Sequence, residues 1–368
     1  MSIIRMKDRE DLLQMKGILQ AFPKCMIAAQ GEYGTPFMNN LCSPAPQSPS
    51  LGNFPIFPQF GCPEDNVDNC FFTKTSRASQ RINGTVEAHP GYFALSLNTS
   101  IHAEMTVTNH TALYRLTFLS NSTTSAQNQT ALPYSPLILV DLTDLPDSRT
   151  NGSIEVDGNT GRIVGNGTFR PSFGIGSYDL HFCADFSGAT VRETGVFINN
   201  RAGIEPKSLR VVPDGINSPP LPAGAWTRFQ APANNQILVR VGVSFISVAR
   251  ACQNAENEIL DFEFDNVRTA AEDVWRQKLG VINIDATGVS GGLQTIFWSG
   301  VYRAMISPQD YTGENPLWQS SEPYYDSYYC IWDSFRSTHP LITFLDPESQ
   351  TRMIRSLIDI YRHEGKLP

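Results

Sequence analysis

Short segments with alternating apolar and polar positions dominate residues 75–250. In one of them an apolar side chain stands at every second position from Ile237 to Phe245. This period of two predicts a β-strand with one buried face. Three other segments have the same β-rich character: Leu113–Leu119, Pro136–Leu142 and Tyr178–Phe186. Many short strands with regular turn signals favour a large antiparallel β-sandwich.

A tight turn separates two further strand-like segments, Ile154–Val156 and Arg162–Val164. The residues between them include the pair Asp157-Gly158 and the glycine Gly161. Asp-Gly pairs favour the turns that join two antiparallel strands. We therefore predict a β-hairpin over this part of the chain.

The period of the apolar positions changes after about residue 260. Three segments, 264–275, 293–305 and 347–361, carry apolar residues at intervals of three or four, which predicts amphipathic helices. The third has Asp346 as its N-cap, Pro347 at the first helical position and Gly365 just after its end. About three helices are too few to complete most helical domains, so we expect the chain to end within a domain.

The length and composition agree with more than one domain. The chain has 368 residues, of which 41% are apolar and 17% charged, so it can bury a sizeable core. We assign 1–47 to a divergent N-terminal segment, 48–260 to the β-sandwich and 261–368 to helices. The net charge of −8 argues against a nucleic-acid partner, which normally requires a basic patch. No apolar stretch is long enough to suggest a membrane span.

Two features indicate the secretory pathway. Cys62 and Cys70 are close enough in sequence for a disulfide that closes a short loop, which suits an oxidising compartment. Residues 1–24 contain many charges and no apolar core of a signal peptide, so we expect that the natural start lies elsewhere. The clustered N-x-S/T sequons predict a glycosylated domain, with acceptors at Asn83, Asn98, Asn109, Asn121, Asn128, Asn151 and Asn166.

Residues 309–340 are the densest candidate for chemistry, because they combine aromatic and acidic side chains. Aromatic rings offer an apolar face to a sugar, and carboxylates accept hydrogen bonds from its hydroxyls. The alternative is a loop whose aromatic residues fill the seam between two domains, and residue types alone favour it. The side chains concerned are Trp318, Tyr324, Tyr325, Tyr328, Tyr329 and Trp332, with Asp310, Glu314, Glu322, Asp326 and Asp333.

Other chemistries have weaker support. The six histidines do not form H-E-x-x-H, so a zinc protease is not indicated. The absence of C-x-x-C pairs argues against a structural zinc site. The spacing of Asp141, Asp144 and Asp147 only loosely resembles a calcium loop, and a solvated loop is the better interpretation.

Several strings in this sequence resemble glycoside hydrolase family 92. The most specific runs from Trp332 through Asp333-Ser334-Phe335-Arg336-Ser337-Thr338 to His339-Pro340, with Ser307–Asp310 before it and Asp346–Glu348 after it. Segments resembling fungal members are Ser48–Pro55, Gly91–Phe93, Asn109–Arg115, Gly195–Phe197 and Asn200–Gly203. The resemblance covers about residues 48–368, whereas Met1–Gln47 lacks the family's glycine-rich opening and histidine-bearing segment.

The resemblance implies a fold and an activity. Family 92 enzymes are calcium-dependent, exo-acting α-mannosidases, many of them α-1,2-specific, which invert the anomeric carbon. Their fold is an N-terminal β-sandwich, a helical linker and a C-terminal (α/α)6 toroid, with the active site between the domains. By this analogy Trp332 and Asp333 line the terminal-mannose subsite, and Arg336 and His339 hold that loop. The catalytic acid, the base and the calcium ligands are expected downstream of Pro368.

The sequence therefore predicts part of a secreted exo-α-1,2-mannosidase that acts on mannose-terminated oligosaccharides or glycoprotein glycans. Calcium is the implied cofactor, and the chain alone is expected to be inactive, because it lacks the acid and base of an inverting enzyme. One alternative is a non-catalytic carbohydrate-binding sandwich. Another is a structural sandwich that only packs against a partner.

Overall fold

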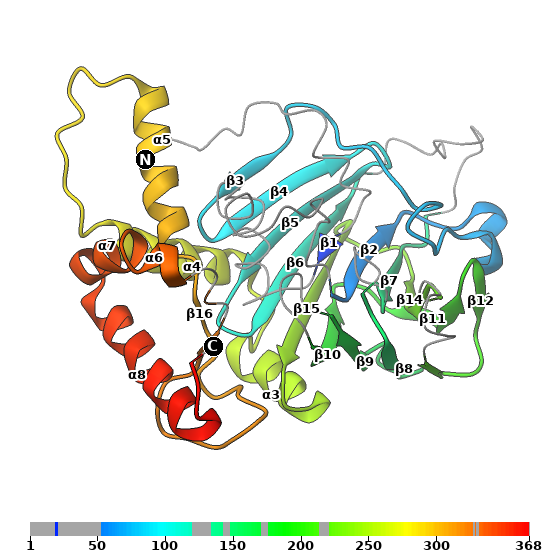
Figure 1. Ribbon diagram of the computed structural model, residues 1–368. Helices are drawn as coiled ribbons and strands as arrows, with labels where there is room; N and C mark the ends of the chain where they lie inside the picture. Colours follow the sequence, from blue (N-terminus) through cyan, green and yellow to red (C-terminus); the bar gives the residue numbers. More distant parts are fainter. Residues whose placement is uncertain are drawn as a thin grey trace.

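The computed structural model describes residues 19–20, 53–119, 134–142, 148–170, 176–212, 221–326, 328 and 331–367. Two antiparallel β-sheets form its first part, and helices follow them, as the sequence predicted (Figure 1). The predicted N-terminal segment 1–47 lies outside the described residues except for 19–20.

Within the described residues, fifteen strands build the two sheets. They are β1 (Leu19–Gln20), β2 (Pro55–Gln59), β3 (Glu87–His89), β4 (Tyr92–Leu97), β5 (Ile101–Val107), β6 (Thr111–Phe118), β7 (Leu137–Asp141), β8 (Asn151–Val156), β9 (Ile163–Phe169), β10 (Tyr178–Ser187), β11 (Val191–Ile198), β12 (Arg201–Gly203), β13 (Ser208–Val211), β14 (Ala223–Phe229) and β15 (Gln236–Ser244). One sheet has the order β1-β2-β7-β14-β11-β12, and the other β13-β8-β9-β10-β15-β6-β5-β4-β3. The predicted hairpin is confirmed, because β8 and β9 pair antiparallel.

The main core lies between the sheets and is filled by side chains from both. Phe54 contacts Phe182 and Phe169, with ring centroids 4.4 and 5.4 Å apart. Ile138 and Val140 of β7 and Val239 and Val241 of β15 join the same cluster, all of them fully buried. Burial of this apolar surface is the main term that stabilises the sandwich.

Strand β15 differs from the prediction of a single buried face, because every residue from Val239 to Ser244 is buried and both faces of the strand are therefore covered. Helix α3 (Val248–Glu258), which the sequence analysis did not predict, packs on the second face. Gly242 makes this contact possible, since a Cβ there would lie 2.1 Å from the Ala251 carbonyl oxygen. The disulfide Cys183–Cys252 joins β10 to α3, and the predicted disulfide Cys62–Cys70 is also present.

The three predicted helices are confirmed as α4 (Phe264–Leu279), α5 (Gly291–Ala304) and α8 (Pro347–Glu364). The Asp346 carboxylate caps α8 by accepting a hydrogen bond from the Ser349 backbone N–H, 3.1 Å away. Gly365 ends the helix in the left-handed conformation, with φ +71°. The structure adds α6 (Ile331–Ser334), α7 (Thr338–Leu345) and two 3₁₀ turns, η1 (Pro63–Asp65) and η2 (Val67–Asn69).

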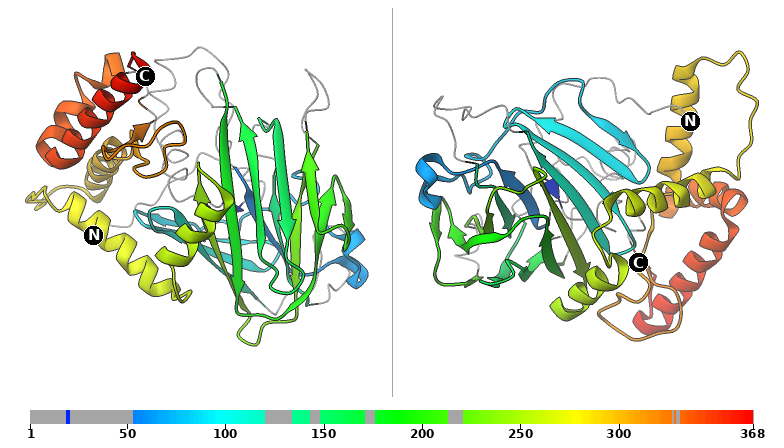
Figure 2. Two further views of the ribbon diagram at one scale, coloured as in Figure 1. Left: turned by 90° about the horizontal axis from the view of Figure 1, so that it is seen from below. Right: turned by 180° about the vertical axis from the view of Figure 1, so that it is seen from behind.

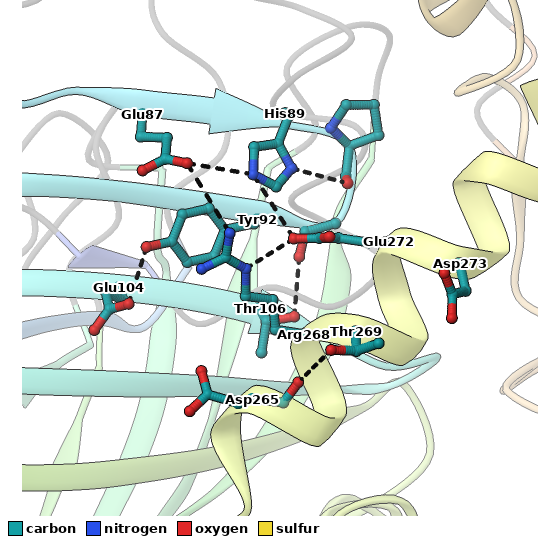
Figure 3. A network of polar contacts seen from close by, with 12 residues as sticks. Glu87, His89, Tyr92, Glu104, Thr106, Asp265, Arg268, Thr269, Glu272 and Asp273 are labelled. Carbon is teal, nitrogen blue, oxygen red and sulfur yellow. Dashed lines mark hydrogen bonds and ion pairs between the residues drawn. The ribbon is translucent and has the colours of Figure 1, made fainter. Parts of the chain in front are cut away.

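Helix α4 packs against strands β4, β5 and β6 of the larger sheet, and a polar network joins it to the sheet (Figure 3). The Arg268 guanidinium lies 3.7 Å from the centroid of the Tyr92 ring and forms an ion pair with Glu272. Glu272 also lies 3.7 Å from His89 of β3. Gly91, with φ +89°, leaves room for the helix, because a Cβ there would lie 2.9 Å from the Ala271 backbone.

The helices after α4 gather on one side of the sandwich (Figure 2) and leave apolar side chains open to solvent. The relative exposure is 70% for Ile296 on α5 and 87% for Phe344 on α7. Leu293, Ile354, Ile358 and Tyr361 are also exposed. Large apolar side chains exposed on several helices on one side of a protein are typical of a surface that contacts further protein. Among the described residues, no helix is long and apolar enough to cross a membrane.

Candidate functional site

The aromatic and acidic segment 309–340 folds back on itself over α8. Its first residues pair with its middle as two short strands, β16 (Gln309–Asp310) and β17 (Tyr325–Asp326). The backbone N–H of Tyr325 donates a 2.8 Å hydrogen bond to the Ser356 hydroxyl of α8. This anchor determines which side chains of the segment face the protein and which face solvent.

Most aromatic side chains of the segment pack on α8. The Trp318 indole stacks on the His363 ring at 4.8 Å and donates a 3.0 Å hydrogen bond to Asp359. The Tyr328 hydroxyl donates to the Met353 carbonyl, and burial raises the pKa of Tyr328 above its usual range. Tyr325 is buried. These contacts agree with the alternative in which the aromatic residues of the segment serve as packing. The surface that they pack against is α8. Tyr329 lies outside the described residues.

Glu314 is a buried structural carboxylate. Its side chain is 2% exposed and accepts hydrogen bonds from the Ser244 hydroxyl at 2.6 Å, the Phe245 backbone N–H at 3.1 Å and the Asn254 amide at 2.9 Å. Arg250 lies 3.4 Å from it. Glu314 therefore ties the segment to the end of β15 and to α3, and its oxygens are already engaged by the protein.

The remaining carboxylates of the segment face different surroundings. Glu322 forms a 2.6 Å ion pair with Arg355, and Asp310 a 2.7 Å ion pair with Arg352. Asp326 is exposed. Because Arg352 and Arg355 both belong to α8, these pairs reinforce the packing of the segment on that helix.

Trp332 and Asp333 lie on the short helix α6. The Trp332 side chain is 69% exposed, unlike Trp318, which is held against α8. The Asp333 carboxylate is partly exposed and forms a 2.7 Å ion pair with Arg336 one turn later. His339 is within hydrogen-bonding distance of Gln350, 3.1 Å away, which connects α7 to α8. An exposed indole and a partly exposed carboxylate on one short helix are side chains of the types that bind a sugar.

Of the three spaced aspartates, only Asp141 belongs to the described residues, and it corrects the prediction of a solvated loop. Asp141 is fully buried and forms a 2.7 Å ion pair with Arg77, which is also buried. Asp144 and Asp147 lie outside the described residues. A buried carboxylate paired in this way is typical of a structural ion pair.

The structure places five of the seven predicted glycosylation acceptors. Asn83, Asn98, Asn109 and Asn151 are exposed, whereas Asn166 is half-buried within β9. Asn121 and Asn128 lie outside the described residues.

The sequence analysis missed the disulfide Cys183–Cys252 and the cluster around Glu314. Four residues separate Cys252 from Ser247, whose hydroxyl caps α3 by accepting from the Arg250 N–H. A serine followed by a helix-compatible run is a signal that could have identified α3. No local pattern indicates the partners of Glu314, which lie 60 to 70 residues away in the sequence.

The fold and the site together define a class of protein, an antiparallel β-sandwich joined to helices, with an aromatic and acidic segment on the helical side. Residues 39–244 match the description "Glycosyl hydrolase family 92 N-terminal domain", and residues 250–368 match "Glycosyl hydrolase family 92 catalytic domain". The chain therefore belongs to glycosyl hydrolase family 92.

A curated relative from Arthroderma benhamiae, described as "Uncharacterized secreted glycosidase", is 49% identical over 314 residues. The match covers 84% of this chain and 40% of the relative. The chain thus spans less than half the length of this relative.

Solved structures share the fold at low identity. A GH92 family glycosyl hydrolase matches with a TM-score of 0.69 and 22% identity over 87% of this chain and 41% of its own. An inverting GH92 mannosidase from Bacteroides thetaiotaomicron matches with a TM-score of 0.68 and 21% identity, over 86% and 39%. A GH92 α-mannosidase of the same organism, in complex with mannoimidazole, has a TM-score of 0.66 and 19% identity, over 87% and 41%.

Proposed function

We propose that this chain is the front part of a secreted exo-α-1,2-mannosidase that removes terminal mannose from glycans with inversion. The observation that carries the proposal is the succession of two family 92 domains along the chain, N-terminal over 39–244 and catalytic over 250–368. The description of the Arthroderma relative as a secreted glycosidase supports the proposed location and class of activity. The two disulfides support an oxidising compartment.

The proposed substrate is a mannose-terminated oligosaccharide or glycoprotein glycan. The names of the mannosidases with the same fold, one of them bound to mannoimidazole, support this choice. In this chain Trp332 offers an exposed aromatic face for the C–H groups of the sugar. Asp333, oriented by Arg336, accepts hydrogen bonds from two hydroxyls. Both residues therefore bind the terminal mannose in our proposal.

An inverting glycosidase needs a carboxylic acid and a carboxylate about 6.5–9.5 Å apart, one to protonate the leaving oxygen and one to activate water. The carboxylates Asp310, Glu314 and Glu322 are held by arginine or by several hydrogen bonds. The family resemblance places the acid and the base beyond these 368 residues, and we propose the same for this protein. The exposed apolar faces of α5, α7 and α8 are then covered by the rest of the catalytic domain, and the chain alone is inactive.

Calcium dependence is a proposal that rests on the family resemblance. Among the described residues, no group of three or more His, Cys, Asp or Glu side chains could hold a metal ion. Calcium prefers six to eight oxygen ligands, which these residues do not supply together. No step of the reaction is therefore assigned to calcium through residues of this chain.

The substrate-binding role of α6 is tested in the full-length protein with two variants and a matched control. Asp333→Asn removes a charged acceptor, and we expect kcat/KM for α-1,2-mannobiose to fall about tenfold or more. Trp332→Ala removes the aromatic face, and we expect a fall of about fivefold. The control Ile204→Ala removes an exposed apolar side chain just after β12, on the side of the sandwich away from the helices (Figure 1), and leaves kcat/KM unchanged. Equal effects of Trp332→Ala and Ile204→Ala would contradict the proposed role.

A further inference from the structure

Three of the sequons occupy the same kind of place in the fold, the first central residue of a tight turn. Asn83 follows Ile82, whose carbonyl accepts hydrogen bonds from the Thr85 backbone N–H at 3.3 Å and hydroxyl at 2.7 Å. Asn98 lies in the turn between β4 and β5, closed by a 3.1 Å bond from the Ser100 N–H to the Leu97 carbonyl. Both asparagines are exposed, and the Asn98 side-chain oxygen accepts a 3.1 Å hydrogen bond from the Gln80 backbone N–H.

The third turn joins β5 to β6 and makes several contacts with α3. Its residues Thr108 and His110 both bind the Glu258 carboxylate at the end of α3, through the Thr108 hydroxyl at 2.5 Å and the His110 backbone N–H at 2.8 Å. The His110 ring lies 2.5 Å from the other oxygen of Glu258. Asn109 stands between these two anchored residues and is exposed. The contacts with α3 therefore fix the turn without using the Asn109 side chain.

Asn166 occupies a different environment, in the middle of β9. It pairs with Ser153 of β8 on one side and with His181 of β10 on the other. Its side-chain oxygen accepts two hydrogen bonds from Ser153, from the backbone N–H at 3.2 Å and from the hydroxyl at 3.0 Å. Directly opposed side chains in a sheet lie about 5 Å apart, so a sugar on Asn166 would overlap both neighbours.

We propose that Asn83, Asn98 and Asn109 carry N-linked oligosaccharides and that Asn166 does not. In the transfer, the Asn side-chain nitrogen forms a bond to C1 of the first sugar of a lipid-diphosphate-linked oligosaccharide. The bond between C1 and the diphosphate oxygen breaks, the lipid diphosphate leaves, and the amide loses one proton. A glycan at any of the three turns extends into solvent, whereas one at the half-buried Asn166 would disturb its side-chain contacts with Ser153 of β8.

The inference requires that the chain enters the secretory pathway, and the leader used in the experiment ensures this entry. The chain is secreted from a yeast host behind a cleavable leader, treated with peptide:N-glycosidase in heavy-oxygen water and analysed by peptide mass spectrometry. We expect most molecules to carry the heavy-oxygen label at Asn83, Asn98 and Asn109 and few to carry it at Asn166. Labelling of Asn166 as complete as that of the turn sites would overturn the inference, as would absence of label at the three turns.

A matched pair of variants gives an independent measurement. Asn109→Gln should increase electrophoretic mobility by one glycan step, and Asn166→Gln should leave it unchanged. The reverse pattern would contradict the assignment. If Asn166→Gln is not secreted, the peptide analysis of the parent chain still decides the question, because it reports each site separately. Because the leader imposes secretion, the result does not depend on whether the protein is a mannosidase.

Discussion

The Glu314 carboxylate lies 2.6 Å from the Ser244 hydroxyl, although 70 residues separate the two in the sequence. Ser244 ends the last strand of the sandwich, and Glu314 belongs to the segment that packs on α8. One buried carboxylate therefore links the sheet to the part of the chain that matches the catalytic domain. We expect this link to contribute to the stability of the folded chain.

Replacement of Glu314 by alanine should lower the free energy of unfolding by about 3 kcal/mol or more. The variant leaves Arg250 and the buried donors of Ser244 and Asn254 without their acceptor, and breaking a buried charged network is costly. Chemical denaturation followed by circular dichroism measures the change. The control Glu322→Ala removes a more exposed ion pair with Arg355 and should cost less than about 1 kcal/mol. Equal losses for both variants would refute the structural role of Glu314.

The two disulfides should differ in their contribution to stability. Cys183–Cys252 spans 69 residues and Cys62–Cys70 spans 8. A disulfide that closes a longer loop removes more entropy from the unfolded chain. Removing the disulfide should therefore lower the free energy of unfolding by about 4 kcal/mol for Cys183–Cys252 and about 2.5 kcal/mol for Cys62–Cys70. Paired Cys→Ser variants, compared by thermal unfolding, measure the difference. A larger loss from the shorter loop would show that chain entropy does not govern these cross-links.

Glu258 should make stability depend on pH in the acidic range. Burial alone would raise the pKa of Glu258, but the hydrogen bonds from His110 and Thr108 outweigh it and leave that pKa below its usual value. A lowered folded-state pKa stabilises the protein above the unfolded-state value and loses that effect as the pH falls through the folded-state pKa.

The Glu258→Gln variant should therefore lose stability near neutral pH and show a flatter fall in stability below about pH 4.5. Unfolding midpoints measured from pH 3 to pH 7, about the range over which a carboxyl titrates, test this. The exposed Glu155→Gln serves as the control. A parent-like acid dependence in Glu258→Gln would exclude Glu258 as its source.

The exposed apolar side chains of α5 and α7 should cause self-association when the chain is produced alone. Replacing Ile296 and Phe344 by glutamate should shift the chain from oligomers toward monomers, because both side chains are exposed and make little contact with the core. Light scattering after size-exclusion chromatography measures the change. A parent chain that is already a soluble, cooperatively melting monomer would count against a surface that requires covering.

Local sequence patterns predicted much of the fold. The sheets, the β8–β9 hairpin, α4, α5 and α8 each have a periodic or capping signal within a few residues, and Cys62–Cys70 is a local contact. The second buried face of β15 was missed because it depends on α3, for which Gly242 makes room. Asp141 was misread because its partner Arg77 is distant in sequence and lies in the interior.

The candidate site was predicted less completely than the fold. Composition marked segment 309–340, but residue types do not distinguish Trp318, which stacks on His363, from the exposed Trp332. The same limit applies to the carboxylates, because Glu314 and Asp333 differ only in the partners that folding brings to them. Tertiary contacts therefore divide one compositional cluster into packing residues and the two residues proposed to bind mannose.

The most direct test of the account is release of free mannose from α-1,2-mannobiose by the purified 368-residue chain, with calcium and again with a chelator. We predict no release by this chain in either condition, and release by the full-length protein. Calcium-dependent release by the chain itself would contradict the account, because an acid and a base would then lie within these 368 residues.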